Sequence, residues 1–178
     1  MQPNIFNTSM KYGFILGIIF SVNFLLSISN NIFLSLLTYV VAVVILVLTY
    51  RFSVLYRDNE NGGKITYGQA FFFIFMLYLF AAIISSVVKF IYFKYINPDY
   101  LSKLIQQSMV TMEQMQNQFN IDIPENALEG VEKIMNPTFY TLQYIWVNTI
   151  LGGLVGLIMA AFIKKDTGIF DKNDERIS

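Results

Sequence analysis

Polar side chains inside long apolar runs are the residues of this sequence that could do chemistry. Ser85 and Ser86 precede Lys89 by four and three residues, so a helix would place all three on one face. A serine activated by a neighbouring lysine is a nucleophile suited to membrane hydrolysis. The same spacing arises in any helix whose lysine extends to the lipid headgroups, and we favour this structural role for Lys89. A buried Lys89 that binds an anion is the alternative.

Two asparagines, Asn23 and Asn148, complete the set of intramembrane polar candidates. Polar residues inside a membrane span are functional candidates by default, because their burial in lipid is costly. At ~100° per residue, Asn148 lies about 40° from Gly152, so we expect it to face other helices. Hydrogen bonding between helices is the favoured role of the asparagines.

Elsewhere the sequence gives little support to enzyme chemistry. It contains no His and no Cys, which removes the imidazole base, the thiol nucleophile and the usual ligands of zinc. No Asp or Glu falls within an apolar run, so a buried carboxylate relay is missing. We therefore predict a protein that is not an enzyme and that has no cofactor and no metal site. The balance of 12 basic and 12 acidic residues gives no reason to bind nucleic acid.

The elements that carry the polar residues are long apolar runs. The chain is 55% hydrophobic and 13% charged, a composition typical of membrane proteins. Residues 12–50 form 39 consecutive positions without a charge. As one helix they would extend about 58 Å, nearly twice a ~30 Å hydrocarbon core. The turn-forming pair Asn30-Asn31 divides the run, so we predict a transmembrane hairpin.

Two further charge-free runs cover residues 65–88 and 138–163. Thr66 followed by Gln69 is a capping-box pattern, and Asn136-Pro137 supplies an N-cap and a first helical residue. The fold class is therefore all-α, an integral membrane four-helix transmembrane bundle in a single membrane domain, residues 1–178. The predicted spans are residues 12–30, 32–50, 67–95 and 137–163.

Residues 97–136, between the third and fourth spans, form a predicted extracytoplasmic helical segment. Its apolar residues follow the spacing of one helical face, namely Leu101, Leu104, Ile105, Met109, Met112, Met115 and Phe119. A second, shorter helix is expected to begin near Asp122. We favour packing of the two helices on each other as a cap on the bundle. Docking of a partner on the methionine-rich face is the alternative.

The basic residues are distributed unequally between the two sides of the four predicted spans. Eight belong to the N-terminus, the 51–64 loop and the tail 164–178, against four on the other side. The positive-inside rule then places both termini in the cytoplasm. A signal peptide is disfavoured, because the first apolar run leads directly into a second one, so we expect an uncleaved first span.

Small residues recur at every fourth position in two of the spans, namely Gly13, Gly17 and Ser21 in the first and Gly152, Gly156 and Ala160 in the fourth. Such ridges let helix backbones approach closely, which matters in lipid because no hydrophobic effect drives helices together. We expect spans one and four to pack on each other through these ridges. The alternative is a homodimer formed by one ridge. The second span has few small residues and should be peripheral.

Several short strings of this sequence resemble a known family. They are residues 12–17 (YGFILG), 65–70 (ITYGQA), Asn136-Pro137 and 151–158 (LGGLVGLI), followed by a basic tail. Together with length and span order, they resemble the bacterial membrane proteins grouped as domain of unknown function 4199. The resemblance implies a small multi-pass protein of the bacterial inner membrane with four helices. It implies no catalytic or binding residue.

Two functions are consistent with these features. The first is a non-enzymatic accessory or interaction protein that engages a membrane-protein partner within the lipid bilayer. The alternative is a small oligomeric transporter or channel subunit for a neutral or weakly polar solute, lined by Asn23, Asn148, Ser85 and Ser86. The sequence specifies neither the partner, the substrate nor the oligomeric state.

Overall fold

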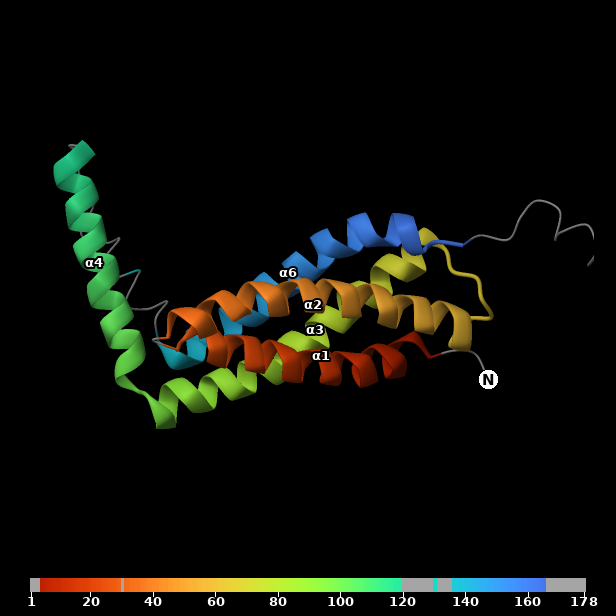
Figure 1. The fold of residues 1–178 in the computed structure, drawn as a ribbon, viewed down its shortest axis with the longest axis horizontal. Coiled ribbons are helices and arrows are strands. Elements are labelled where there is room, and N and C mark those ends of the chain that lie inside the picture. Colours follow the sequence, from red (N-terminus) through yellow and green to blue (C-terminus); the bar gives the residue numbers. More distant parts are fainter. Residues whose placement is uncertain (1–3, 30, 120–129, 131–135, 166–178) are drawn as a thin grey trace, which may run out of the picture. The chain divides into compact units, whose positions relative to one another are not determined.

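The computed structural model of the 178-residue chain describes residues 4–29, 31–119, 130 and 136–165. The described part is built of helices (Figure 1). They are α1 (Ile5–Ser27), α2 (Ile32–Leu55), a π-helical turn η1 (Tyr56–Glu60), α3 (Tyr67–Ile91), a second π-helical turn η2 (Tyr92–Ile96), α4 (Asp99–Phe119) and α6 (Pro137–Ile163). The all-α prediction is confirmed.

Four of these helices are long and apolar enough to cross a membrane, namely α1, α2 with η1, α3 with η2, and α6. Their bounds differ from the predicted spans where a single charge was taken as a helix end. Lys11 lies inside α1, which begins at Ile5, and Arg51 lies inside α2, which continues to Leu55. One exposed charge does not break a helix, because its side chain points outward and leaves the backbone hydrogen bonds intact.

Each apolar helix begins with a side chain that satisfies a free backbone N–H group. The amide N of Phe6 donates to Asn4 Oδ1 (3.2 Å), and that of Phe33 donates to Asn31 Oδ1 (2.9 Å). The predicted capping box at α3 is confirmed: the Thr66 amide donates to Gln69 Oε1 (3.1 Å), and the Gln69 amide donates to Thr66 Oγ1 (3.3 Å). Asn136 caps α6 in the same way as Asn4 and Asn31 cap their helices. These caps fix where each apolar helix starts.

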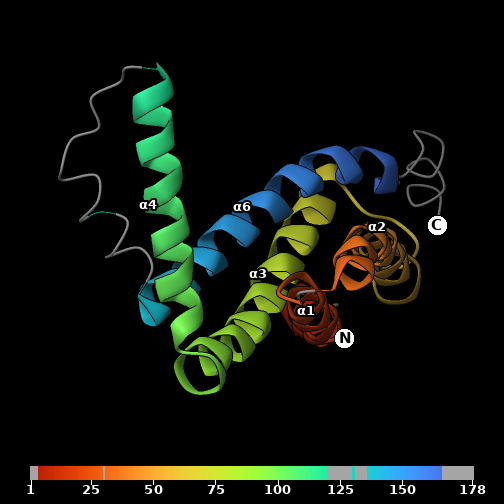
Figure 2. The same cartoon turned by 60° about the vertical axis from the view of Figure 1, so that its left-hand side comes forward.

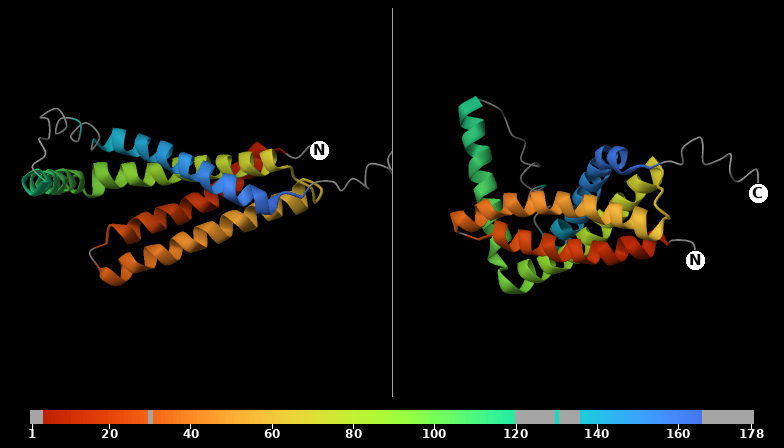
Figure 3. Two further views of the ribbon diagram at one scale, coloured as in Figure 1. Left: turned by 90° about the horizontal axis from the view of Figure 1, so that it is seen from above. Right: turned by 45° about the vertical axis from the view of Figure 1, so that its right-hand side comes forward.

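The chain divides into two compact units. Unit 1 comprises residues 1–85 and 147–178, and unit 2 comprises residues 86–146. In unit 1, α1 and α2 lie side by side as a hairpin (Figures 1 and 3). In unit 2, α4 follows the end of α3 through a turn (Figure 2).

The two ridges of small residues both pack against α3. A Cβ atom added to Gly13 would lie 2.6 Å from Phe80 Cβ and 3.0 Å from the Leu77 carbonyl oxygen. One added to Gly152 would collide with the Tyr78 side chain. The prediction that spans one and four pack on each other through these ridges is therefore wrong. The four-residue spacing identifies each ridge, but it cannot show which helix packs against that ridge.

The remaining members of the ridges share this environment. Gly17 approaches Ile84 and the Ala81 carbonyl, while Gly156 approaches Phe71 and Ile74. Ser21 is buried and donates its hydroxyl hydrogen to the Gly17 carbonyl oxygen (2.8 Å), and Ala160 is fully buried. All six small residues thus occupy packed positions in unit 1.

Helix α2 is peripheral, as expected. Its buried residues are confined to its C-terminal half, namely Ile45, Thr49, Phe52 and Ser53. The Thr49 hydroxyl donates to the Ile45 carbonyl oxygen (2.8 Å), and the Ser53 hydroxyl donates to that of Thr49 (2.8 Å). These side chains satisfy their own polar groups, so α2 can bury them at little cost.

We predict that Gly152→Ala destabilises the protein, whereas Gly153→Ala leaves its stability nearly unchanged. The new methyl group at residue 152 would overlap the base of Tyr78, while at residue 153 it would lie 3.7 Å from Phe75, an ordinary contact. Overpacking of this kind costs about 1–3 kcal/mol. Thermal unfolding of the two purified variants in one detergent measures the difference. Equal melting temperatures would contradict the packing of Gly152 on Tyr78.

Candidate functional site

Lys89 lies in the last turns of α3 and is buried. Its side chain is 8% exposed, and its Nζ atom lies 3.7 Å from the ring centroid of Tyr144 on α6. The sequence predicts that Lys89 extends to the lipid headgroups, whereas in the structure its side chain is buried between helices. The face of the tyrosine ring carries a partial negative charge that attracts the ammonium group, so this cation–π contact compensates for the water that Lys89 loses.

An aromatic pair lies one helical turn further along both helices. Phe93 follows Lys89 by four residues, and Tyr140 precedes Tyr144 by four. The Phe93 and Tyr140 rings meet edge to face with centroids 5.3 Å apart, and Phe93 is 1% exposed. Tyr100 at the start of α4 packs on Phe93 as well, with centroids 5.6 Å apart. Lys89 is therefore positioned by a helix pair whose register is fixed by aromatic packing.

The two serine candidates are buried on α3. Ser86 belongs to unit 2 with Lys89 and is 6% exposed, while Ser85 belongs to unit 1 and is fully buried. Hydroxyl groups in such positions commonly hydrogen-bond within or between helices. The structure thus places the serines and Lys89 among packed helical residues.

The two asparagine candidates both lie in unit 1, on different helices. Asn23 on α1 is half-buried, and its Oδ1 atom is buried and lacks a hydrogen-bond partner among the residues that the structure describes. The expected hydrogen bond between helices is therefore not made by this atom within the described residues. Asn148 is half-buried on α6. An unsatisfied buried acceptor is rare in proteins, so Asn23 Oδ1 is an unusual polar atom among the described residues of unit 1.

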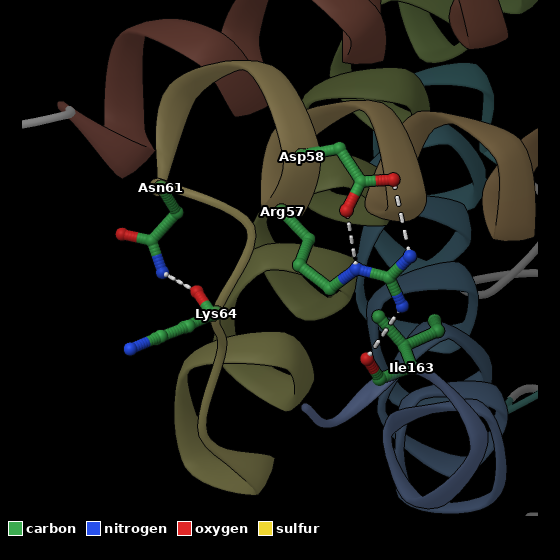
Figure 4. Close-up of polar contacts among 5 residues, drawn as sticks. All are labelled: Arg57, Asp58, Asn61, Lys64 and Ile163. Carbon is green, nitrogen blue, oxygen red and sulfur yellow. Dashed lines mark hydrogen bonds and ion pairs between the residues drawn. The ribbon is translucent and has the colours of Figure 1, made fainter. Parts of the chain in front are cut away.

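Sequence reasoning missed a polar cluster at the end of unit 1 (Figure 4). Arg57 makes two hydrogen bonds to Asp58 (2.7 and 3.1 Å) and donates a third to the Ile163 carbonyl oxygen at the end of α6 (3.1 Å). Nearby, Ile65 and Lys165 pair through two backbone hydrogen bonds (3.0 and 2.9 Å). The cluster ties the loop after α2 to the last turn of α6. In the sequence, Arg57 is simply a basic residue next to an acid, and nothing indicates its third partner.

Helix α4 is amphipathic, as predicted from the spacing of its apolar residues. On its apolar face Leu101 is 3% exposed, whereas Met115 and Phe119 are 49% and 59% exposed. Its charged residues are Asp99, Lys103 and Glu113. The second helix predicted for this segment lies almost entirely outside the described residues, so its packing on α4 stays a prediction. The apolar face of α4 is therefore covered at its start and exposed at its end.

We predict that Tyr144→Leu destabilises the protein and that Tyr144→Phe does so much less. Leucine removes the ring face under the Lys89 ammonium group, whereas phenylalanine keeps it. A desolvated cation–π contact contributes about 2 kcal/mol. Chemical unfolding in detergent measures both changes.

The double variant Lys89→Met with Tyr144→Leu supplies the control, because without the buried charge the ring face has nothing to stabilise. The loss caused by Tyr144→Leu should shrink in this background. If it is the same with and without Lys89, the cation–π contact does not contribute to stability.

Comparison with known proteins agrees with the family resemblance of the sequence. A family model described as "Protein of unknown function (DUF4199)" matches residues 11–165, from within α1 to the end of α6. No curated protein and no solved structure matches the chain. Because the match covers most of the chain, including three apolar helices in full and most of α1, this protein belongs to the DUF4199 family.

Proposed function

We propose that this protein is a non-enzymatic accessory protein of the bacterial inner membrane that engages another membrane protein through the outer end of α4. The observation that carries the proposal is the apolar face of α4, which leaves Met115 and Phe119 exposed. Exposed large apolar side chains grouped on one face are typical of interaction sites.

The orientation supports an outer location for α4. Four spans place the N-terminus, the 51–64 loop and the C-terminal tail on one side, and that side holds eight of the 12 basic residues. By the positive-inside rule it is the cytoplasmic side, so the segment between α3 and α6 faces outward. Both termini are then cytoplasmic.

The charges of α4 favour a protein partner over the lipid surface. A helix that lies on a membrane usually carries several Lys or Arg residues on its polar face, where they meet anionic lipid. Lys103 is the one basic residue of α4, and Asp99 and Glu113 outweigh it. Methionine side chains adapt to irregular surfaces, which suits Met109, Met112 and Met115 to a protein contact.

The alternative function, a small oligomeric transporter for a neutral or weakly polar solute, draws support from the buried Oδ1 atom of Asn23, which accepts no hydrogen bond from the described residues. Such an acceptor could contact a solute in transit. Vesicles that contain the purified protein would then release a neutral solute, whereas vesicles that contain an Asn23→Leu variant would not. This result would favour transport over the accessory role.

We predict that a photoreactive amino acid placed at Met115 or Phe119 crosslinks one and the same protein in native membranes. Both positions lie on the exposed apolar face of α4. Gln114 is the matched control, because it is also exposed and lies ~100° around the helix from Met115. Immunoblotting followed by mass spectrometry identifies the adduct.

The adduct should disappear when Met112→Gln is combined with the photoreactive residue at Met115, because the change makes the apolar face polar. Equal crosslinking from Gln114 would indicate random collision. Crosslinks to lipid alone would show that α4 lies on the membrane, and either result would overturn the proposal.

We also predict that a reporter enzyme active only outside the cytoplasm stays inactive when fused after Ser178. A cytoplasmic reporter at the same position should be active, since both termini are expected on the basic side. The matched fusion at Gly130, between α4 and α6, should give the opposite pair of activities. If the reporter that works outside the cytoplasm is active after Ser178, the C-terminus lies outside and the proposed orientation is wrong.

A further inference from the structure

Two cations mark the ends of the longest charge-free stretch of the chain. Lys11 immediately precedes residues 12–50, and Arg51 immediately follows them. The hairpin of α1 and α2 brings the two ends together: the neighbouring rings, Tyr12 and Phe52, stack with centroids 4.6 Å apart and an interplanar angle of 18°. Lys11 and Arg51 are therefore held at the same level of unit 1, on adjacent helices, and both are exposed.

Helix geometry places both cations on one side of the hairpin. Successive residues are ~100° apart, and α1 and α2 run in opposite directions, so the residue before each stacked ring points to the same side. The residue after Tyr12 is Gly13, which packs on Phe80 of α3. The side that carries Lys11 and Arg51 is thus the one that faces away from α3.

Two acidic residues in the described part of unit 1, Asp58 and Glu60, have other partners. Asp58 forms an ion pair with Arg57. The Glu60 carboxylate accepts a hydrogen bond from the Thr8 hydroxyl. Neither Lys11 nor Arg51 has a carboxylate partner in the described part of the chain. Two exposed positive charges with no counter-charge of their own attract an anion.

Aliphatic side chains continue from each cation toward the tip of the hairpin. They stand four, seven and eleven positions away on both helices, so each set lies on the same helical face as its cation. All six are exposed, namely Ile15, Ile18 and Val22 on α1 and Val47, Val44 and Val40 on α2. Each row extends about 16 Å from its cation, at ~1.5 Å per residue. A pair of cations at the head of two apolar rows matches the charge and shape of a lipid with an anionic headgroup.

We propose that Lys11 and Arg51 form a binding site for the phosphate of an anionic phospholipid, whose acyl chains lie along the aliphatic rows of α1 and α2. Lysine and arginine both donate charge-assisted hydrogen bonds to phosphate oxygens. The Tyr12–Phe52 stack sets the separation of the two cations before the lipid arrives, which lowers the entropy cost of binding. A free phosphate ion would use the same two cations but not the aliphatic rows.

Native mass spectrometry of the full-length protein in detergent, with equimolar phosphatidylglycerol and phosphatidylcholine, tests the site. Each cation near a membrane surface favours anionic lipid by about 1 kcal/mol, or about fivefold, so two cations should give a preference of roughly tenfold or more. Lys11→Gln with Arg51→Gln should lower the preference to within about twofold. The matched control is Lys164→Gln with Lys165→Gln. Both lysines belong to unit 1 and are exposed, and their replacement removes the same total charge. This control should keep the wild-type preference.

Three results would overturn the proposal. The Lys11/Arg51 variant could keep the wild-type preference for phosphatidylglycerol, or the Lys164/Lys165 control could lose this preference to the same extent. Displacement of the lipid by millimolar inorganic phosphate would instead indicate a site for free phosphate. The charge-preserving variant Lys11→Arg with Arg51→Lys should retain the preference.

A second measurement covers the case in which the glutamine variant fails to fold. A photoactivatable phosphatidylglycerol added to the wild-type protein should label peptides that contain residues 11–22 and 40–51. Labelling of α6 peptides to the same extent would exclude the site.

Discussion

Close contact between α3 and the glycines of two other helices is the interaction on which unit 1 depends. Gly13 and Gly17 bring α1 against Leu77, Phe80 and Ala81, and Gly152 brings α6 against Tyr78. In lipid, attraction between helices comes from van der Waals contact and hydrogen bonds, both of which need short distances. A glycine at each contact permits those distances. Helix α2 lacks such a ridge and buries fewer residues.

The polar groups of the protein lie mostly where a neighbour can satisfy them. Asparagine and threonine side chains cap the starts of the apolar helices, and Arg57 binds the carbonyl oxygen at the end of α6. Lys89 loses water but gains the face of Tyr144. Lys11 and Arg51 differ from these groups, because they are exposed and have no carboxylate partner in the described residues, and each immediately precedes one of the two stacked rings, Tyr12 and Phe52. That difference supports the proposed ligand site, and the exposed aliphatic side chains on the same helical faces favour a lipid as the ligand.

The proposed accessory role and the proposed lipid site concern different units of the chain. The accessory role depends on α4 in unit 2, and the lipid site depends on the α1–α2 hairpin in unit 1. Either could fail without the other.

The sequence by itself determined the number of apolar helices, the caps of α3 and α6 and the amphipathic face of α4, because each depends on neighbours within a few residues of the chain. Charge gaps, the Thr66–Gln69 capping box and the Asn136-Pro137 pair are signals of this local kind. Tertiary structure alone decided that both glycine ridges pack on α3, that Lys89 packs on Tyr144, that Arg57 reaches Ile163 and that the Tyr12 ring stacks on the Phe52 ring. Each of these pairs joins residues at least 40 positions apart. Their meeting depends on how whole helices pack, and periodicity within one helix carries no information about which helix lies opposite.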